Sequence, residues 1–291
     1  MSLFLQQVMN GLVIGSTYAV VAIGFALAFT VLRVIHFAHP EVFMIGMFAG
    51  MMGSNWAPGS GLLFALVAGA IGAAIVGFVI ERLVISPLRG RDMLMTLVAT
   101  IGVSIILQNG MAIIVGPDPV PYPNLIPAHT VELGAVSLTL RQLANFGVCI
   151  TLVALVSLYV RYTSIGRATR AIAEQPAVSA AFGINVARVC QVTILVASIM
   201  AGVAAVSVGA LYGSTSAFVG LFYGLKAFIA MLVAGNRYFE GAALVAIALG
   251  VIEALVTGYV SSGMRDVVAF MLLIGVLYLR PNGIFGSFNS H

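Results

Sequence analysis

The segment VMNGLVIGSTYAVVAIGFALAFTVL, residues Val8 to Leu32, contains no charged side chain over a length that matches a lipid bilayer. A hydrocarbon core about 30 Å thick is crossed by roughly 20 residues of α-helix. Further uncharged stretches follow at residues 42–80, 93–115 and 142–160. Because a helix satisfies its own backbone hydrogen bonds in lipid, the sequence predicts an all-α polytopic integral membrane protein.

The composition agrees with this prediction. Of the 291 residues, 61% are apolar and 8% are charged, against about 25% charged in an average soluble domain. The first apolar segment lacks a basic leader and a small-residue cleavage site, so we interpret it as a retained span and not a signal peptide. Cys149 and Cys190 lie in or beside apolar segments, where a thiol packs as a small hydrophobe. In a membrane protein, a net charge of +4 reflects basic residues in the cytoplasmic loops and does not indicate nucleic-acid binding.

The apolar segments predict a single transmembrane domain over residues 1–291. The second and the last segment are short enough to be re-entrant or half-helices that line a cavity. We therefore expect about eight or nine transmembrane helices, some of them broken. The candidate crossings are Val8–Leu32, Val42–Gly53, Gly61–Val84, Met93–Val115, Leu143–Val160, Val189–Leu211, Ala217–Ala234, Gly241–Val260 and Val267–Leu279.

Basic residues predict how these spans are oriented. If the loops alternate, most of the 13 Lys and Arg residues fall on one side, which marks that side as cytoplasmic. The segment 161–188 would then be cytoplasmic, the Pro-rich loop 116–141 would be outer, and the chain would begin outside and end inside. The residues on the cytoplasmic side are Arg33, Arg82, Arg89, Arg91, Arg161, Arg167, Arg170, Arg188, Arg237 and Arg280.

Small residues recur at four-residue spacing in the spans, as at Gly11 and Gly15 or Gly209 and Gly213. This spacing lets helix backbones approach closely in lipid, so we interpret it as helix packing. No internal repeat is visible in the sequence.

Residues His36 to Glu41 (HFAHPE) bring two histidines and a carboxylate close together. A metal site would need a third or fourth ligand, and no other cluster of His or Cys is visible, so we expect no metal. The segment fits a helix start, with His39 as cap, Pro40 in the first helical position and Glu41 in the first turn. Inside the membrane, such a start would point N–H groups into a cavity, as broken helices do when they bind carboxylates. An ordinary interfacial loop is the alternative.

Lys226 (YGLKAFIAML) and Glu253 (LGVIEALVTG) lie well inside apolar runs. A charge at membrane depth is costly unless it is paired or hydrated, so both side chains should face the bundle interior. They could pair with each other and fix two helices, or they could contact a substrate. Both interpretations remain open from the sequence.

The sequence shows no catalytic constellation and no nucleotide-binding loop. Its nearest approach, GLFYGLK at Gly220 to Lys226, has Leu225 between the second glycine and the lysine, and Ala where Ser or Thr should follow. We therefore expect no ATP hydrolysis by this chain and no bound cofactor.

The hydrophilic stretch 161–188 has the pattern of two short helices on either side of Pro176. Arg167 and Arg170 lie on one helical face, and Gly183 is a helix stop signal. This stretch has too little apolar surface to fold alone, so we expect it to dock on a partner.

Several motifs, taken in order, resemble the permease subunits of ABC importers for branched-chain amino acids, the high-affinity LIV type. Each motif alone is weak, but their joint order is specific and covers nearly the whole chain. The motifs are NGLVIGSTYAVVAIGFALAF at Asn10, VLRVIHFAHPE at Val31, ERLVISPLRG at Glu81, LVATIGVSIILQN at Leu97, SIGRATRAIAEQPAVSAAFGIN at Ser164, GLKAF at Gly224 and LRPNGIFG at Leu279.

The resemblance implies a multi-pass permease of the bacterial plasma (inner) membrane that works with several partners. These are a second permease subunit, identical or homologous, two cytoplasmic ATPases that bind the ATP, and a periplasmic or extracellular substrate-binding protein. The segment Gly166–Asn185 is similar to the coupling helix that inserts into a cleft of an ATPase. We expect ATPase contacts from Gly166, Arg167, Arg170, Glu174 and Gly183, and a substrate path along His36, Phe37, His39, Glu41, Lys226 and Glu253.

Two departures from the family pattern bear on function. The family usually shows Asn-Phe-Ala-His-Gly where this chain has His36 to Pro40, and its glycine-rich turn after GLKAF is here AGNRYFEG. The first departure lies on the expected substrate path, and an extra imidazole favours a carboxylate or a more polar substrate than leucine, isoleucine or valine.

Two other classes of protein remain as alternatives. A stand-alone secondary transporter would use Lys226, Glu253 and Glu41 as an ion-coupling relay. An intramembrane enzyme would need a catalytic pair at depth, for which His36 with Glu41 is the candidate. Dependence on a partner ATPase separates the importer from both.

Overall fold

The computed structural model describes residues 2–56, 61–134, 136–235 and 239–285. Within these ranges, seven helices are long and apolar enough to cross a membrane. Two shorter helices, α2 (His39–Trp56) and α10 (Val219–Ala234), lie among them. The architecture is therefore the all-α polytopic bundle that the sequence predicts. Of the two segments expected to be short, the second is the short helix α2, whereas the last belongs to a helix long enough to span.

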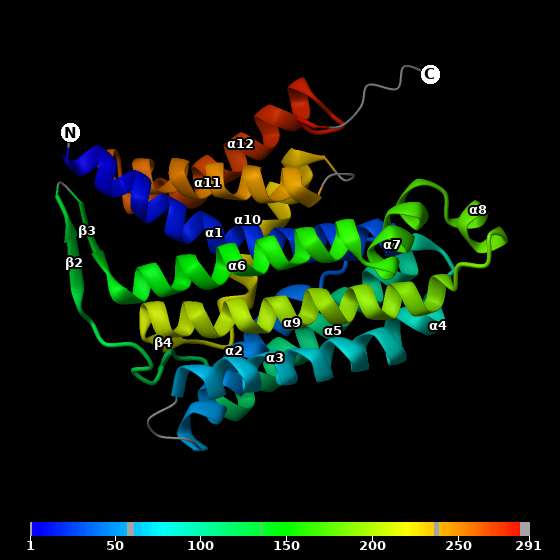
Figure 1. Ribbon diagram of the computed structural model, residues 1–291, viewed down its shortest axis with the longest axis horizontal. Helices are drawn as coiled ribbons and strands as arrows, with labels where there is room; N and C mark the ends of the chain where they lie inside the picture. Colours follow the sequence, from blue (N-terminus) through cyan, green and yellow to red (C-terminus); the bar gives the residue numbers. More distant parts are fainter. Residues whose placement is uncertain (1, 57–60, 135, 236–238, 286–291) are drawn as a thin grey trace.

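Figure 1 shows the order of the elements along the chain. The other helices are α1 (Ser2–Leu32), α3 (Gly61–Ile80), α4 (Ser86–Leu88), α5 (Met93–Val115), α6 (Leu140–Tyr162), α7 (Ser164–Glu174), α8 (Pro176–Ala181), α9 (Val186–Tyr212), α11 (Phe239–Tyr259) and α12 (Arg265–Leu279). Four short strands accompany them: β1 (Val120–Pro121), β2 (Thr130–Leu133), β3 (Val136–Thr139) and β4 (Ser214–Thr215).

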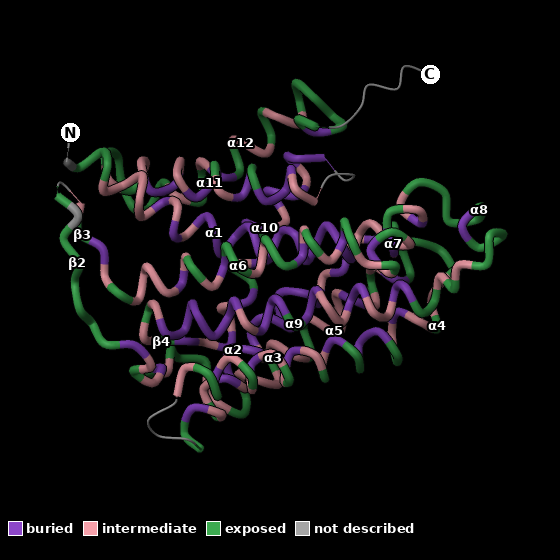
Figure 2. Tube along the Cα trace, viewed as in Figure 1, coloured by how far each residue is buried: buried purple, intermediate pink, exposed green. Residues whose placement is uncertain are grey.

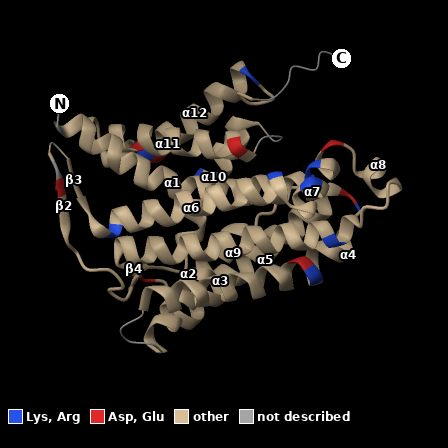
Figure 3. Cartoon of the chain, in the orientation of Figure 1, with Lys and Arg blue, Asp and Glu red and all other residues tan. Residues whose placement is uncertain are grey.

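The two hydrophilic segments lie at opposite ends of the bundle (Figure 1). The Pro-rich loop lies at the end where α1 begins. In this loop β2 and β3 form an antiparallel hairpin, and β1 pairs with β4. The segment with α7 and α8 lies at the other end. Basic side chains gather at that end (Figure 3), which is the distribution that the positive-inside rule describes for a cytoplasmic face. Arg237 lies outside the described residues.

The structure contains two similarly built units that the sequence did not show. In each unit a long helix, a short linker, a short helix and a second long helix follow one another: α1, residues 33–38, α2 and α3, then α9, residues 213–218, α10 and α11. The units interlock, because α1 packs on α11 and α10 while α9 packs on α3 and α2. Since α1 and α9 run in opposite directions (Figure 1), the arrangement is an inverted one.

Close helix contacts in both units depend on glycine. A methyl group at Gly11 would lie 2.5 Å from the Val251 Cα, and one at Gly202 would lie 2.3 Å from the Gly69 carbonyl oxygen. This is the small-residue packing predicted from the sequence. Gly213 is different, because it ends α9 in the left-handed conformation and faces open space.

The core consists mainly of α1, α2 and α9, whose side chains are largely buried (Figure 2). In contrast, α5 and α12 bury few residues and expose long rows of apolar side chains. These outer helices therefore face lipid or another membrane subunit.

Candidate functional site

Four helices bring five ionisable or polar side chains together in the membrane region. The Lys226 Nζ lies 2.8 Å from the Glu253 Oε1 and 3.0 Å from the Asp266 Oδ1. The Arg265 Nε donates to the Glu253 Oε2 at 3.0 Å, and the Tyr18 hydroxyl donates to the same oxygen at 3.0 Å. We name Tyr18, Lys226, Glu253, Arg265 and Asp266 the Glu253 cluster.

The Glu253 cluster is electrically balanced and structural in character. Glu253 is fully buried, and its carboxylate is surrounded by two cations and a hydroxyl donor. A buried carboxylate is tolerated only when it is paired in this way. The contacts join α1, α10, α11 and α12, so the cluster anchors α12, of which only Ala269 is buried.

The sequence left open whether Lys226 and Glu253 pair or contact a substrate, and the structure brings them into contact. The other members of the cluster were not predicted. Arg265 and Asp266 are the first two residues of α12. The sequence does contain a signal for these two residues. Adjacent opposite charges at the start of an apolar helix are unusual unless each has a partner.

The segment 36–41, which we name the His36 segment, forms a buried helix start. Helix α2 begins at His39, so Pro40 and Glu41 lie in its first turn. The Glu41 Oε1 accepts a hydrogen bond from the Ser104 hydroxyl at 3.1 Å, and the Phe37 N–H donates to the Thr100 hydroxyl at 3.3 Å. These contacts hold the segment against α5.

The two histidines of the His36 segment are almost completely buried, with 2% and 1% of their surface exposed. Both ring nitrogens of His36 and the Nε2 of His39 have no hydrogen-bond partner among the described residues. His39 packs edge-on against Phe25, with 5.0 Å between the ring centroids. The described ranges contain no group of three or more His, Cys, Asp or Glu side chains able to hold a metal ion.

Helix α10 connects the His36 segment with the Glu253 cluster. Its first turns press on the start of α2: a methyl group at Gly220 would lie 2.3 Å from the Pro40 carbonyl oxygen. Tyr223 stacks on Phe43 of α2 at a centroid distance of 5.2 Å and contacts the Tyr18 ring at 5.8 Å. The predicted substrate-path residues therefore form two separate clusters joined by an aromatic row, and not a single site.

The unit formed by α7 and α8, which we name the α7–α8 unit, is tied to the bundle at its base. Gly166 lies so close to α6 that a methyl group would sit 2.3 Å from the Tyr159 carbonyl oxygen. The Thr169 and Thr193 hydroxyls are 3.1 Å apart, and Arg33 donates to the carbonyl oxygens of Ala173 and Glu174. These contacts join α7 to α6, α9 and the end of α1.

The two predicted coupling arginines point back toward α6. The Arg167 Nη1 donates to the Tyr162 carbonyl oxygen at 3.0 Å, and the Arg170 Nη2 donates to the Arg161 carbonyl oxygen at 3.3 Å. They satisfy carbonyl groups at the end of α6, where cations are favourable. The exposed apolar side chains of the unit are Val178 and Phe182, and Gly183 follows with a φ of +84° that allows the chain to turn.

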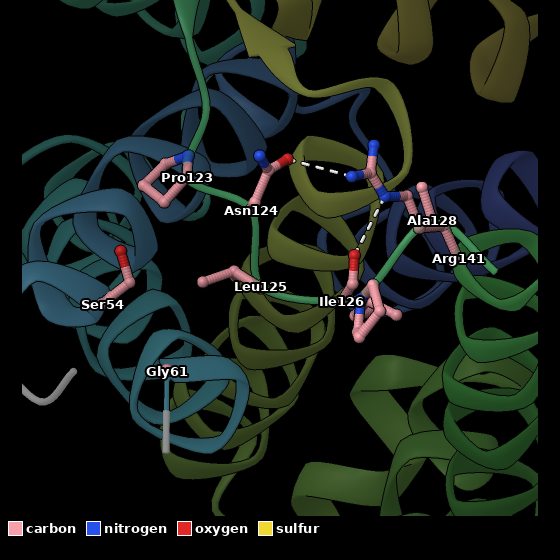
Figure 4. Close-up of a pocket in the computed structure, with 9 residues that line it drawn as sticks. Ser54, Gly61, Pro123, Asn124, Leu125, Ile126, Ala128 and Arg141 are labelled. Atoms are coloured by element: carbon pink, nitrogen blue, oxygen red, sulfur yellow. Dashed lines mark hydrogen bonds between the residues drawn. The ribbon is translucent and has the colours of Figure 1, made fainter. Parts of the chain in front are cut away.

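At the opposite end, Arg141 organises the Pro-rich loop beside a cavity of about 560 Å³ (Figure 4). Its Nε donates to the Ile126 carbonyl oxygen at 3.0 Å, and its Nη2 donates to the Asn124 Oδ1 at 2.9 Å. The arginine thus has a structural role in folding this loop onto the start of α6.

The structure is a bundle of apolar helices with balanced buried charge and a buried helix start, and a helical unit projects from its basic end. These features define an integral membrane transport subunit. Comparison with known sequences specifies the family. A family model described as "branched-chain amino acid transport system / permease component" matches residues 7–277. The chain belongs to this family.

Three curated relatives illustrate the match. The high-affinity branched-chain amino acid transport system permease protein LivH of Salmonella typhimurium is 37% identical over 97% of this chain and 96% of the relative. LivH of Escherichia coli K12 is also 37% identical, with the same coverage. The corresponding permease protein BraD of Pseudomonas aeruginosa is 36% identical, again over 97% and 96%.

Family membership confirms the main expectations from sequence. The chain is a permease subunit of an ABC importer, a transport component and not an enzyme. It is a multi-pass protein of the bacterial plasma membrane and works with other components of its transporter. The stand-alone secondary transporter and the intramembrane enzyme are not supported by these relatives.

Proposed function

We propose that this chain and a second permease subunit, identical or homologous, form a translocation path for branched-chain amino acids or a related small amino acid, amide or carboxylate. A binding protein on the outer side would deliver the substrate, and two cytoplasmic ATPases would bind ATP and supply the energy. The chain itself would need no cofactor. The substrate named in the descriptions of LivH and BraD supports the class of molecule.

The position of the α7–α8 unit is the observation that supports this proposal most directly. It projects from the basic end of the bundle (Figure 3), and its base is fixed to α1, α6 and α9. Its tip exposes Val178 at 45% and Phe182 at 84%, two apolar side chains that a partner surface would cover. A rigid base with an apolar tip suits an element that receives a movement from a partner and transmits it to the bundle.

Within this unit the predicted residues divide into two roles. Gly166, Arg167 and Arg170 position the unit, because their contacts are with α6. Glu174 and Gly183 are both exposed, and Gly183 directly follows Phe182. The second group would form the ATPase contact.

The His36 segment is the part of the chain that we assign to the substrate path. Its imidazole nitrogens have no protein partner within the described ranges, and the Glu41 Oε2 is also without one. Buried polar atoms normally find partners. Atoms that lack them in one conformation are available to a substrate or to water in another.

The proposed mechanism uses the interlocked units as rigid bodies. ATP-driven approach of the two ATPases would move α7 and, through Arg33, the end of α1 and the linker 33–38. Because α1 packs on α11 and α9 packs on α3, we expect the two permeases to rock between inward-open and outward-open states without unpacking. The path would open beside the start of α2.

Uptake into proteoliposomes tests this proposal. The chain, its partner permease, both ATPases and the binding protein would be assayed with labelled amino acids, amides and aromatic acids. We expect uptake only with the ATPases and ATP, and a loss of about tenfold for Phe182→Ala, which corresponds to ~1.4 kcal/mol of coupling. Tyr278→Ala is the matched control, because Tyr278 is an aromatic residue that is also 84% exposed but lies on α12.

Two results would contradict the proposal. Uptake by the chain alone on an ion gradient would favour a secondary transporter. An equal loss in the Phe182→Ala and Tyr278→Ala variants would remove the specific role of the α7–α8 unit.

A further inference from the structure

A cavity of about 840 Å³ lies at the basic end of the bundle, and none of its lining residues belongs to the His36 segment or the Glu253 cluster. It is enclosed by the last turns of α1 and α6, by α7 and by the start of α11. Part of the lining is apolar and consists of Leu27, Phe29, Val160 and Phe239. The remainder is strongly polar, so the cavity is amphipathic.

The polar part of the lining contains three arginines and two glutamates, Glu174 and Glu240. Arg161 forms an ion pair with Glu240, with 2.6 Å between its Nη2 and the Oε1. Arg33 and Arg170 differ, because they donate to backbone carbonyl groups and each does so through its Nη2 alone. Neither forms an ion pair with a carboxylate in the part of the chain that the structure describes.

The guanidinium groups of Arg33 and Arg170 have no anionic partner and lie beside an apolar wall at the inner membrane surface. This combination favours a particular ligand. The guanidinium fork matches the oxygen geometry of a phosphate group. The cytoplasmic leaflet is rich in anionic lipids, and basic cavities between helices on this side are suited to their headgroups. A free anion would use the arginines but leave the apolar wall unoccupied.

We propose that this cavity binds one anionic glycerophospholipid of the inner leaflet. Its phosphate group contacts Arg33 and Arg170, and an acyl chain lies against Leu27 and Phe239. Because the same arginines hold α7 to the end of α1 and to α6, the bound lipid stabilises the position of the α7–α8 unit.

Lipid binding to the full-length chain in detergent tests this inference. Native mass spectrometry would compare phosphatidylglycerol with phosphatidylcholine carrying identical acyl chains. We expect a preference for phosphatidylglycerol of roughly tenfold or more, from about 1 kcal/mol for each arginine. The double variant Arg33→Gln with Arg170→Gln should lose this preference.

The matched control is Arg82→Gln with Arg188→Gln, two exposed arginines at the same end that do not line the cavity. This control should keep the preference. Equal loss in both double variants would show attraction to the whole basic surface and would overturn the proposal, as would the absence of any preference in the wild type.

A measurement on the wild-type chain covers the case in which the double glutamine variant does not fold. A photoactivatable phosphatidylglycerol should attach to residues 27–33 and 160–174, and unlabelled phosphatidylglycerol should compete. Competition by inorganic phosphate at equal concentration, or attachment only elsewhere, would contradict a lipid site.

Discussion

The Glu253 cluster and the His36 segment are both buried and both contain ionisable side chains, yet they differ in how these groups are satisfied. Every charge of the Glu253 cluster has an opposite charge within about 3 Å. In the His36 segment, three ring nitrogens and a carboxylate oxygen lack a partner among the described residues. We infer that the first region fixes helices in one arrangement, whereas the second is left free to bind something that enters the path.

The largest effect should come from Glu253→Gln. This change removes the anion between Lys226 and Arg265, and breaking a buried ion pair costs about 3–5 kcal/mol. Thermal unfolding in detergent would measure the loss of stability. Glu240→Gln is the control, because Glu240 pairs with Arg161 at an exposed site, where a loss within about 1 kcal/mol is expected. Equal effects of the two changes would contradict the assigned structural role.

Combining Lys226→Met with Glu253→Gln should recover part of that loss. Glu253→Gln alone leaves two cations, Lys226 and Arg265, with the single anion Asp266, whereas the double variant restores the charge balance. The interaction free energy of residues in one network is about 0.5–3 kcal/mol. The same unfolding assay on both single variants and on the double variant gives this term. Strictly additive losses would show that the two residues act independently.

A smaller effect should follow from Gly220→Val, which tests the contact between the two regions. The new side chain would overlap the Pro40 carbonyl group, and overpacking of this kind costs about 1–3 kcal/mol. Gly102→Val is the matched control, because Gly102 on α5 has open space around it. If Gly220→Val changes neither stability nor uptake, α10 does not link the regions as described.

The smallest effect on stability should come from His36→Asn, which restores the residue that the family usually has. We expect a loss of about 1 kcal/mol in unfolding free energy, because the His36 ring nitrogens make no hydrogen bond to lose but the smaller side chain leaves part of a buried site unfilled. Uptake should instead shift toward leucine, isoleucine and valine. An unchanged uptake profile would remove His36 from the path.

Sequence reasoning succeeded where the signal was local. Uncharged runs located the helices, and HPE located the start of α2 within one residue. The cost of charge in lipid predicted that Lys226 and Glu253 face the bundle interior, where both are buried. Each of these predictions needed only a neighbouring stretch of chain and one physical rule.

The missing parts depend on contacts between distant segments. Tyr18 and Arg265 come from different helices to donate hydrogen bonds to Glu253, and no spacing in the sequence predicts these contacts. The two inverted units are alike in their helix lengths and backbone packing. Different side chains can produce both features, so the similarity is not visible in the sequence. The direction of Arg167 and Arg170 was hidden because an arginine on a helix can point to a partner or to the preceding helix end.

The most direct test of the difference between the two regions is thiol labelling in the assembled importer. Single cysteines would replace Phe37, in the His36 segment, and Ala254, beside Glu253, in a chain whose own Cys149 and Cys190 are buried. We predict that a polar thiol reagent labels Phe37→Cys at a rate that changes with ATP and falls with substrate, whereas Ala254→Cys stays unlabelled. Labelling of Ala254→Cys with substrate protection, while Phe37→Cys remains inert, would contradict the account.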